Sequence, residues 1–269
     1  MAMFMVKPWY AKRKKTYQGI WVSKSWNVNP DYGYNIWNDG TTSYYSQKYS
    51  TQYGLNSSSS QWETKTWYYN GSTTNLIAGN NIWTDGDDIY HSDSMAYENW
   101  ILNKATSTWS RISMTTQPDP RMIWHDGNNT YYSGGGVSYQ YVWDKTNKRW
   151  NSMTWSTYDD ITGSYIWTDG NNIYYSYSSI QKVLDRTNNS WVNKTWNGMS
   201  SFYGGWERIW TDGNDIYYSY GSTQKVLNKT NNTWEDKTWS GLTSFNANRI
   251  WKNEDNIYYS TGSTQYELT

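Results

Sequence analysis

The strongest constraint on the fold of this chain is a dipeptide, Ile-Trp, that recurs at nearly constant spacing. The copies are Ile36-Trp37, Ile82-Trp83, Ile123-Trp124, Ile166-Trp167, Ile209-Trp210 and Ile250-Trp251. Successive tryptophans are 46, 41, 43, 43 and 41 residues apart. Self-similarity at a period of roughly 20 to 50 residues indicates a repeat architecture. The six copies occupy nearly all of the 269 residues, which leaves no room for a second folded domain.

Each copy divides into four short segments that read as strands. In the copy that begins at Ile209, the expected strands are 209–211, 216–219, 224–228 and 234–239. Asp212-Gly213 follows the first of them, and an Asp-Gly pair between β-rich runs is a strong hairpin signal because glycine takes positive φ without steric cost. Four strands in each repeat make one blade of a β-propeller. We therefore predict an all-β fold, a six-bladed β-propeller of four-stranded antiparallel blades.

The two ends of the chain predict how the ring closes. The sixth copy stops at Thr269, after its third strand, and lacks the fourth. The missing segment is found at residues 21–26, Trp-Val-Ser-Lys-Ser-Trp, which match residues 191–196, Trp-Val-Asn-Lys-Thr-Trp. The N-terminal strand should therefore complete the last blade, a closure that removes a free sheet edge. On this basis residues 1–18 form an N-terminal basic arm and residues 19–269 form the propeller.

Composition supports strands over helices. A mean hydropathy of −0.98 with 36% hydrophobic residues would ordinarily indicate disorder. The 21 tryptophans and 28 tyrosines supply the missing apolar area, and aromatic residues pack well on pleated surfaces. No stretch sustains the apolar spacing of an amphipathic helix, so a helical fold is disfavoured. A different all-β fold remains the alternative.

Charge and hydropathy limit the classes of partner. Lys+Arg and Asp+Glu each number 23, so the chain lacks the basic stripe of a nucleic-acid binder. No window reaches the ~18 apolar residues of a membrane span. The N-terminal apolar stretch precedes the charges, the reverse of a secretory signal. The only basic run, Lys12, Arg13, Lys14 and Lys15, is either a solvated arm or an attachment point for an acidic partner.

Residues that could support catalysis or metal binding are few. The chain has no cysteine and only two histidines, His91 and His125, so we expect no zinc site and no cofactor. An aspartate recurs at the first hairpin of five copies: Asp39, Asp85, Asp126, Asp169 and Asp212. Recurrence at one turn indicates turn chemistry rather than catalysis. Nothing in the sequence marks a Ser-His-Asp arrangement, and we predict that the protein is not an enzyme.

The repeat resembles the kelch pattern. Residues 226–234, Val-Leu-Asn-Lys-Thr-Asn-Asn-Thr-Trp, place a Trp several residues after a strand and its turn, as kelch repeats do, and residues 134–136 are a kelch-like glycine cluster. The period is shorter than the kelch value of about 50 residues. The resemblance covers residues 19–269. It implies a propeller without fixing a function, because propellers host binding, scaffolding and catalysis.

The repeated wording Ile-Trp-Thr-Asp-Gly followed by Ile-Tyr-Tyr-Ser is more narrowly similar to Trp-rich kelch-like proteins encoded by bacteriophages of intestinal bacteria. This resemblance implies a virion-associated protein of the tail, neck or capsid. We further expect synthesis in the bacterial cytoplasm, and the order of apolar and charged residues at the N-terminus predicts that no signal peptide is present.

The links between blades are the best candidates for a binding site, because they vary most between copies and sit on a fixed scaffold. In a four-stranded propeller they share one face with the links between strands two and three. The candidate ligand-binding residues come from two successive links: Tyr158, Asp159, Asp160, Tyr203, Trp206 and Arg208. Aromatic faces beside Asp and Arg suit sugar rings. The alternative is that these aromatic residues, with Phe202, fill gaps between blades.

Three functions follow, in decreasing order of preference. The first is a non-enzymatic binding or structural protein of a phage particle, attached to other virion proteins or to a bacterial surface glycan, with Lys12, Arg13, Lys14 and Lys15 as its attachment residues. The second is a soluble lectin whose similar blades act together by avidity. The third is a hydrolase or lyase with a site at the mouth of the ring.

Overall fold

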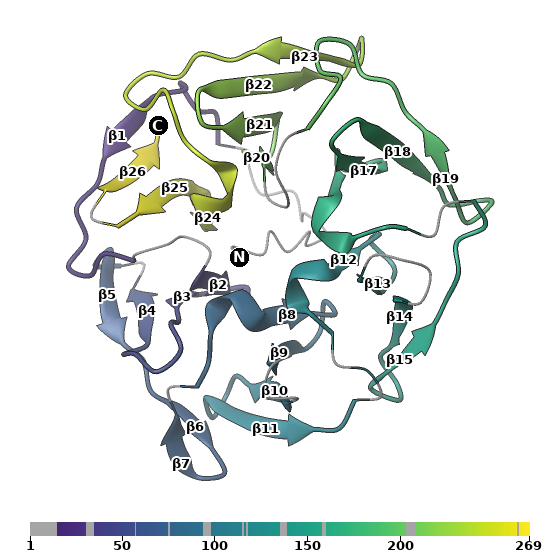
Figure 1. The fold of residues 1–269 in the computed structure, drawn as a ribbon. Helices are drawn as coiled ribbons and strands as arrows, with labels where there is room; N and C mark the ends of the chain where they lie inside the picture. The colour runs from purple at the N-terminus through teal and green to yellow at the C-terminus, as the bar shows by residue number, and fades with distance from the viewer. Residues whose placement is uncertain are drawn as a thin grey trace.

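The computed structural model describes residues 15–30, 35–56, 58–74, 76–93, 98–114, 116, 118–134, 139–157, 160–202, 208–262 and 264–269. Six sheets stand around a central axis, and each contains one of the six Ile-Trp copies in its innermost strand (Figure 1). We number the blades by these copies, so that Ile36 lies in blade one and Ile250 in blade six. The predicted six-bladed β-propeller is confirmed.

Blades one to three contain the following strands. Blade one has β2 (Ile36–Asn38), β3 (Ser43–Tyr45), β4 (Tyr53–Asn56) and β5 (Gln61–Thr64). Blade two has β8 (Ile82–Thr84), β9 (Ile89–Asp93), β10 (Glu98–Asn103) and β11 (Thr108–Ile112), with β6 (Trp67–Tyr69) and β7 (Ser72–Thr74) added outside. Blade three has β12 (Ile123–His125), β13 (Thr130–Ser133), β14 (Gln140–Asp144) and β15 (Arg149–Ser152).

Blades four to six repeat this arrangement. Blade four has β16 (Ile166–Thr168), β17 (Ile173–Tyr177), β18 (Ile180–Asp185) and β19 (Ser190–Asn193). Blade five has β20 (Ile209–Thr211), β21 (Ile216–Tyr220), β22 (Thr223–Asn228) and β23 (Thr233–Asp236). Blade six has β24 (Ile250–Asn253), β25 (Asn256–Thr261), β26 (Thr264–Leu268) and, from the other end of the chain, β1 (Trp21–Ser23).

The N-terminal strand closes the ring as predicted. Strand β1 pairs antiparallel with β26, so that Trp21 lies opposite Leu268. The backbone N–H of Thr269 donates to the carbonyl of Ile20 at 2.9 Å, which extends the ladder. Both ends of the chain therefore stabilise the same blade.

Blade two carries a hairpin that the predicted four-strand blade does not include. Strands β6 and β7 are joined by Asn70 and Gly71, which both have positive φ (48° and 78°), and β6 pairs in parallel with β11. Asn-Gly is the pair that two-residue hairpin turns of this handedness favour. The four-strand repeat does not predict this hairpin, although Asn70-Gly71 is a hairpin signal in the sequence.

The core consists of separate clusters that lie between neighbouring blades. Between blades five and six, Trp210 of the inner strand, Trp239 of the link and Trp21 of the next outer strand pack with ring centroids 5.5 to 6.2 Å apart. The predicted fourth strand, 234–239, ends earlier, at Asp236. Trp239 is thereby free to enter the gap between the blades, where it is buried.

The same trio of tryptophans recurs at five of the six junctions. The other four are Trp251, Trp26 and Trp62; Trp37, Trp67 and Trp109; Trp124, Trp155 and Trp191; and Trp167, Trp196 and Trp234. At the junction of blades two and three the link position holds Met114. Trp143 fills that space from β14, where the other blades have leucine, and its ring lies 5.2 Å from that of Trp83.

A hydrogen bond inside each blade explains why the sequence motifs Ile-Trp and Tyr-Ser recur together. In all six blades the indole Nε1 of the inner-strand tryptophan donates to the serine Oγ nine residues later, at 2.8 to 2.9 Å. The pairs are Trp37–Ser46, Trp83–Ser92, Trp124–Ser133, Trp167–Ser176, Trp210–Ser219 and Trp251–Ser260. Burying an indole N–H without an acceptor is costly, so the serine allows the tryptophan to enter the core.

The exposed edge of the outer strand is covered by the link from the preceding blade. The backbone N–H groups of Trp234 and Trp21 donate to the carbonyls of Asn197 and Ser240, at 2.9 and 2.8 Å. At the junction of blades six and one, the Asn27 side chain replaces the backbone and exchanges two hydrogen bonds with Trp62. Covering an edge strand in this way prevents pairing with other chains and ties each blade to the next.

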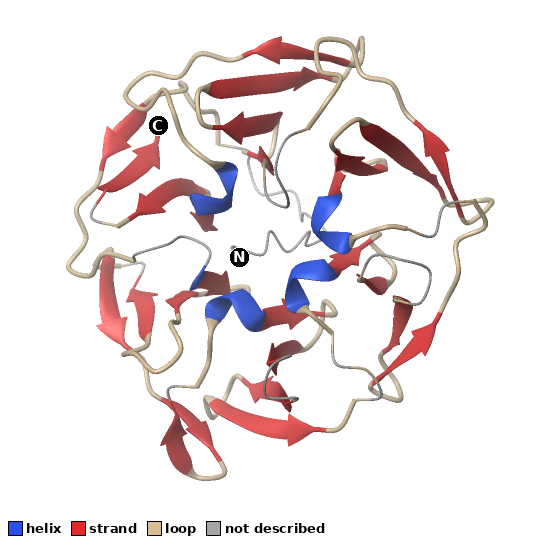
Figure 2. Ribbon diagram, viewed as in Figure 1, coloured by secondary structure: helices blue, strands red, loops and turns tan. Residues whose placement is uncertain are grey.

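Short 3-10 helices lead into the inner strands and surround the axis at one end (Figure 2). They are η2 (Gly79–Asn81), η3 (Pro120–Met122), η4 (Gly163–Tyr165) and η5 (Ala247–Arg249). A Cβ on Gly163 would lie only 1.9 Å from the carbonyl oxygen of Met122, so glycine allows the backbones of successive blades to touch. None of these helices, nor any other in the described ranges, is long and apolar enough to span a membrane.

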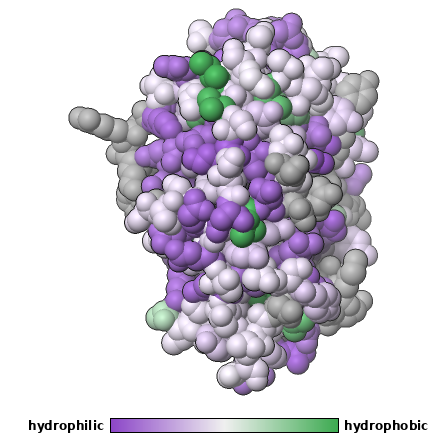
Figure 3. Space-filling view, turned by 90° about the vertical axis from the view of Figure 1, so that its left-hand side faces the viewer, coloured by the Kyte–Doolittle hydropathy of each residue, from purple (hydrophilic) through white to green (hydrophobic). Residues whose placement is uncertain are grey.

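The side of the ring that carries β1 and β26 is mostly hydrophilic, with isolated hydrophobic residues (Figure 3). Val22 of β1 is one exposed hydrophobic residue of this strand. Scattered residues of this kind are normal on soluble surfaces and define no interface.

Candidate functional site

The two ends of the propeller have different chemistry. One end, called here the link end, carries the links between blades and the links between strands two and three. These contact each other: Ser178 pairs with Phe202, and Gly134 pairs with Thr162. The expectation that both kinds of link share one face is confirmed. The opposite end, the turn end, carries the turns between strands one and two and between strands three and four.

The recurring aspartates of the turn end stabilise their own turns. Asp169 Oδ1 accepts the backbone N–H groups of Asn171 and Asn172 at 2.9 and 2.7 Å, and its Oδ2 accepts the Tyr174 hydroxyl at 2.8 Å. Burial acts to raise the pKa of Asp169, but these hydrogen bonds outweigh it and the pKa falls below the usual value. Asp39, Asp85, Asp126 and Asp212 make the same three contacts. The prediction of turn chemistry is confirmed.

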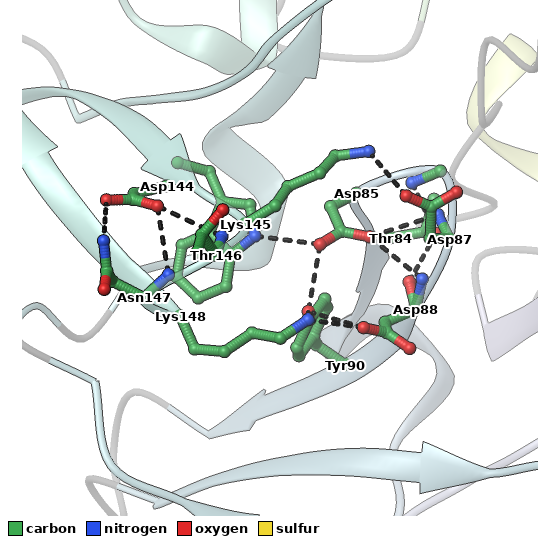
Figure 4. A network of polar contacts seen from close by, with 12 residues as sticks. Thr84, Asp85, Asp87, Asp88, Tyr90, Asp144, Lys145, Thr146, Asn147 and Lys148 are labelled. Atoms are coloured by element: carbon green, nitrogen blue, oxygen red, sulfur yellow. Dashed lines mark hydrogen bonds and ion pairs between the residues drawn. The ribbon is translucent and has the colours of Figure 1, made fainter.

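Charged residues of the turn end also hold neighbouring blades together, most densely between blades two and three (Figure 4). Lys148 of blade three contacts Asp88 Oδ2 at 2.5 Å and the Tyr90 hydroxyl at 2.8 Å. Lys145 pairs with Asp87 at 3.0 Å. Arg186 of blade four likewise donates to the preceding blade, where the carbonyl of Asp126 accepts at 2.8 Å. These contacts give the turn end a structural role.

Both histidines make contacts within the blades that stabilise the fold. His91 is completely buried, accepts the Ala78 backbone N–H at 3.3 Å through Nε2, and has a pKa lowered to about 3 by burial. His125 contacts the Thr130 hydroxyl at 3.0 Å, and burial lowers its pKa to about 4. Neither is positioned as an exposed acid or base. Within the described ranges, no three His, Asp or Glu side chains gather in a way that could hold a metal ion.

Two of the six predicted ligand-binding residues fall in the described chain. Asp160 is exposed on the link that enters blade four, and Arg208 directly precedes β20 of blade five. Tyr158, Asp159, Tyr203 and Trp206 lie outside the described residues. Phe202 is buried against Tyr218 and Trp234, so for this residue the alternative of filling a gap between blades is confirmed.

One of the four predicted attachment residues is described, and it is packed on the ring. Lys15 donates from Nζ to Asn256 Oδ1 at 2.7 Å, and its carbonyl accepts from Asn214 at 3.4 Å. The Tyr17 hydroxyl donates to the carbonyl of Asp255, and burial raises the Tyr17 pKa to about 12. Lys12, Arg13 and Lys14 lie outside the described residues. The last residues of the predicted arm therefore contact the turn end of blades five and six.

The link end of blades four and five presents aromatic residues that we did not predict as a site. Tyr165 and Tyr177 stack with centroids 4.4 Å apart, and the Arg208 guanidinium carbon lies 4.4 Å above the Tyr220 ring. Tyr177 and Tyr220 are 43% and 42% exposed, which sets them apart from the buried repeat aromatics. In both blades the contact joins two equivalent positions of the repeat. One is the residue directly before Ile-Trp, and the other is the residue directly after Tyr-Ser.

Aligning the repeats would have revealed these positions, because both vary among otherwise uniform copies. The residue before Ile-Trp is Asn35, Asn81, Met122, Tyr165, Arg208 or Arg249. The residue after the serine is Gln47, Asp93, Gly134, Tyr177, Tyr220 or Thr261. Only blades four and five place a tyrosine at the second position.

Comparisons with known proteins show similarity of fold and no match of sequence to a family model or a curated protein. The solved structure of YjhT is similar with a TM-score of 0.59 at 9% identity, over 86% of this chain and 91% of that one.

A second solved structure is an extracellular domain from B. thetaiotaomicron, described as part of a hybrid two component system. It is similar with a TM-score of 0.50 at 10% identity, over 86% of this chain and 33% of that one. The chain thus spans about a third of that protein's length. At these identities the similarity shows a shared β-propeller fold.

Proposed function

We propose that this protein is a non-enzymatic binding protein of a phage particle, that its basic arm attaches it to the particle, and that its link end binds a further virion protein or the host surface. The observation that carries the binding role is the contrast between the two ends of the ring. Turn-end aspartates, inner-strand Trp–Ser pairs and core tryptophan trios recur from blade to blade, whereas the link end changes. Function concentrates where a rigid scaffold carries variable loops.

A binding role is also favoured over catalysis by the state of the ionisable groups. His91 is buried and His125 is half-buried, both with lowered pKa values, and the recurring aspartates are engaged by backbone N–H groups and tyrosine hydroxyls. A general acid or base must instead reach a substrate with a pKa near the working pH.

The phage assignment rests on the kelch-like repeat wording and on its similarity to Trp-rich phage proteins. It places the protein in the tail, neck or capsid after synthesis in the bacterial cytoplasm. The basic run at residues 12–15 is the proposed attachment peptide. Because Lys15 and Tyr17 contact blades five and six, a clean test removes residues 1–14 and leaves these contacts intact.

The experiment compares full-length protein with the 1–14 deletion during particle assembly. Both should show the same thermal unfolding, and only the full-length protein should be recovered with purified particles. Equal recovery of the two forms would refute the arm as the attachment element. Absence of the full-length protein from particles would refute the virion role itself.

A lectin-like function is the second candidate, and it is favoured by the exposed tyrosines of the link end in blades four and five. Exposed aromatic rings with a polar edge are suited to recognition surfaces. Saturable binding of the isolated protein to a glycan array would support this candidate.

A further inference from the structure

We infer that the link end of blades four and five is a carbohydrate-binding site selective for saccharides that bear a carboxylate. In this site Tyr177 and Tyr220 provide stacking faces and Arg208 binds the carboxylate. The inference deepens the proposed binding function and rests on it.

The first half of the site is a fixed tyrosine pair on blade four. Tyr165, the last residue of η4, stacks on Tyr177 at 4.4 Å and packs edge-on against Tyr175 at 6.0 Å. Tyr177 lies opposite the exposed Ile180, and the two residues flank the two-residue connection of the β17–β18 hairpin. An aromatic ring held by a neighbour and still 43% exposed offers a flat apolar face whose ordering cost has been met on folding.

The second half is Arg208 with Tyr220 on blade five. The guanidinium stacks over the exposed Tyr220 ring at 4.4 Å, in the range of a cation–π contact. Its Nε and Nη1 are shielded from solvent and have no hydrogen-bond acceptor among the described residues. A charged donor that is buried without an acceptor is costly, so an acceptor supplied to the guanidinium would be stabilising. Carboxylates match the geometry of guanidinium donors better than neutral oxygens do.

Charge along the ring favours an anion at this place. Arg249 of η5 occupies in blade six the position that Arg208 occupies in blade five. Two neighbouring blades therefore place arginine at the same point of the link end. Blade two instead places Asp93 in the position of Tyr177, where it is paired with Lys48 at 2.5 Å. Arginine directly precedes the Ile-Trp pair only in blades five and six.

The geometry favours a sugar over a peptide. The strand ends that carry Tyr177 and Tyr220 are already paired, with Tyr177 opposite Ile180 and Tyr220 opposite Thr223. No free strand edge is offered there for a peptide to extend the sheet. Separate, preformed aromatic faces on adjacent blades instead suit a chain of pyranose rings, whose C–H faces stack on aromatic groups.

The test uses full-length protein and three sets of probes: hexuronic-acid oligomers, the corresponding neutral hexose oligomers, and an oligoglutamate of similar charge. Affinities are measured by calorimetry for the wild type and four variants: Arg208→Gln, Tyr177→Ala, Tyr220→Ala and, as the control, Tyr139→Ala. Tyr139 is an exposed tyrosine of the link end in blade three. Thermal unfolding identifies any variant that has lost its fold.

We expect uronic oligomers to bind about tenfold more tightly than neutral ones, and Arg208→Gln to abolish that difference. Tyr177→Ala and Tyr220→Ala should each weaken both kinds of sugar about tenfold, while Tyr139→Ala leaves them unchanged. Equal binding of acidic and neutral sugars, binding of oligoglutamate alone, or no binding of any uronic oligomer would overturn the inference. Attachment to particles or cells that persists in Arg208→Gln would leave the proposed function standing.

Discussion

The indole Nε1 of Trp143 donates to Asp85 Oδ2 at 2.9 Å, across the junction of blades two and three. This bond exists because Trp143 replaces the leucine found at its position in the other blades. The link into blade three carries Met114 where the other links carry tryptophan. At this junction the third tryptophan therefore lies in a strand instead of in the link, and its indole N–H donates to the carboxylate of a turn aspartate.

This exchange predicts that residues 114 and 143 are energetically coupled. Trp143→Leu should cost about 2 to 4 kcal/mol of unfolding free energy, because it leaves a cavity and removes a hydrogen bond to a buried carboxylate. The double variant Met114→Trp with Trp143→Leu restores the arrangement of the other five junctions and should recover much of the loss. Denaturant unfolding of both single variants and the double variant measures the coupling. Strictly additive losses would show that the two positions are independent.

A second prediction concerns the glycines where links meet outer strands. Gly241 has φ +83°, and a Cβ there would lie 2.0 Å from the Trp21 carbonyl oxygen. Gly241→Ala should therefore cost more than about 3 kcal/mol, since it combines backbone strain with a clash at the closing blade. Gly221→Ala is the matched control, with φ +56° and no atom within 4 Å. It should cost only about 1 kcal/mol. Equal melting temperatures for the two variants would contradict the proposed packing of the link on β1.

The buried histidines predict a loss of stability in mild acid. Burial lowers the His91 pKa to about 3, whereas an unfolded histidine titrates near ~6.5. Between these values the unfolded chain binds a proton that the folded chain does not, so stability falls as pH falls through this window. At about pH 5.5, above the range of most carboxylates, His91 should account for about 1 kcal/mol of the loss.

His91→Tyr, which restores the residue of the other blades, isolates this effect. The variant should lose less stability than the wild type when unfolding is measured at pH ~7.5 and then at ~5.5. His125→Thr provides the parallel case, because burial lowers its pKa to about 4. An unchanged pH dependence in both variants would show that the histidines do not control acid stability.

The repeat made the scaffold predictable. The contacts made by residues that depart from the repeat could not be predicted. Residues 21–26 matched residues 191–196, so the closing strand followed from sequence comparison within the chain. The Trp37–Ser46 bond was not predicted, although the two residues recur together, because periodicity shows that positions are equivalent and does not show which of them touch. Trp143 and Met114 depart from the repeat in two different segments, and their shared place at one junction cannot be seen from a single copy of the repeat.

The candidate site shows the same limit. Arg208 was predicted as a candidate because it lies on a variable link. Its partner Tyr220 lies at the end of a strand, within the sequence Tyr-Tyr-Ser-Tyr, and within a single copy of the repeat nothing distinguishes it from the regular tyrosines. Stacking of Tyr165 on Tyr177 depends on how η4 places its last residue beside β17. Such pairings arise when the link end is assembled, and the spacing of residues along one copy does not specify them.

The central claim, that the link end of blades four and five is the binding surface, is tested most directly by binding of purified protein to host bacterial cells. Wild type is compared with Tyr177→Ala and Tyr220→Ala, and with Lys145→Ala, which removes the cation of an exposed turn-end ion pair. We predict saturable binding that is about tenfold weaker in each tyrosine variant and unchanged in Lys145→Ala. Full binding by both folded tyrosine variants, or a loss confined to Lys145→Ala, would contradict the claim.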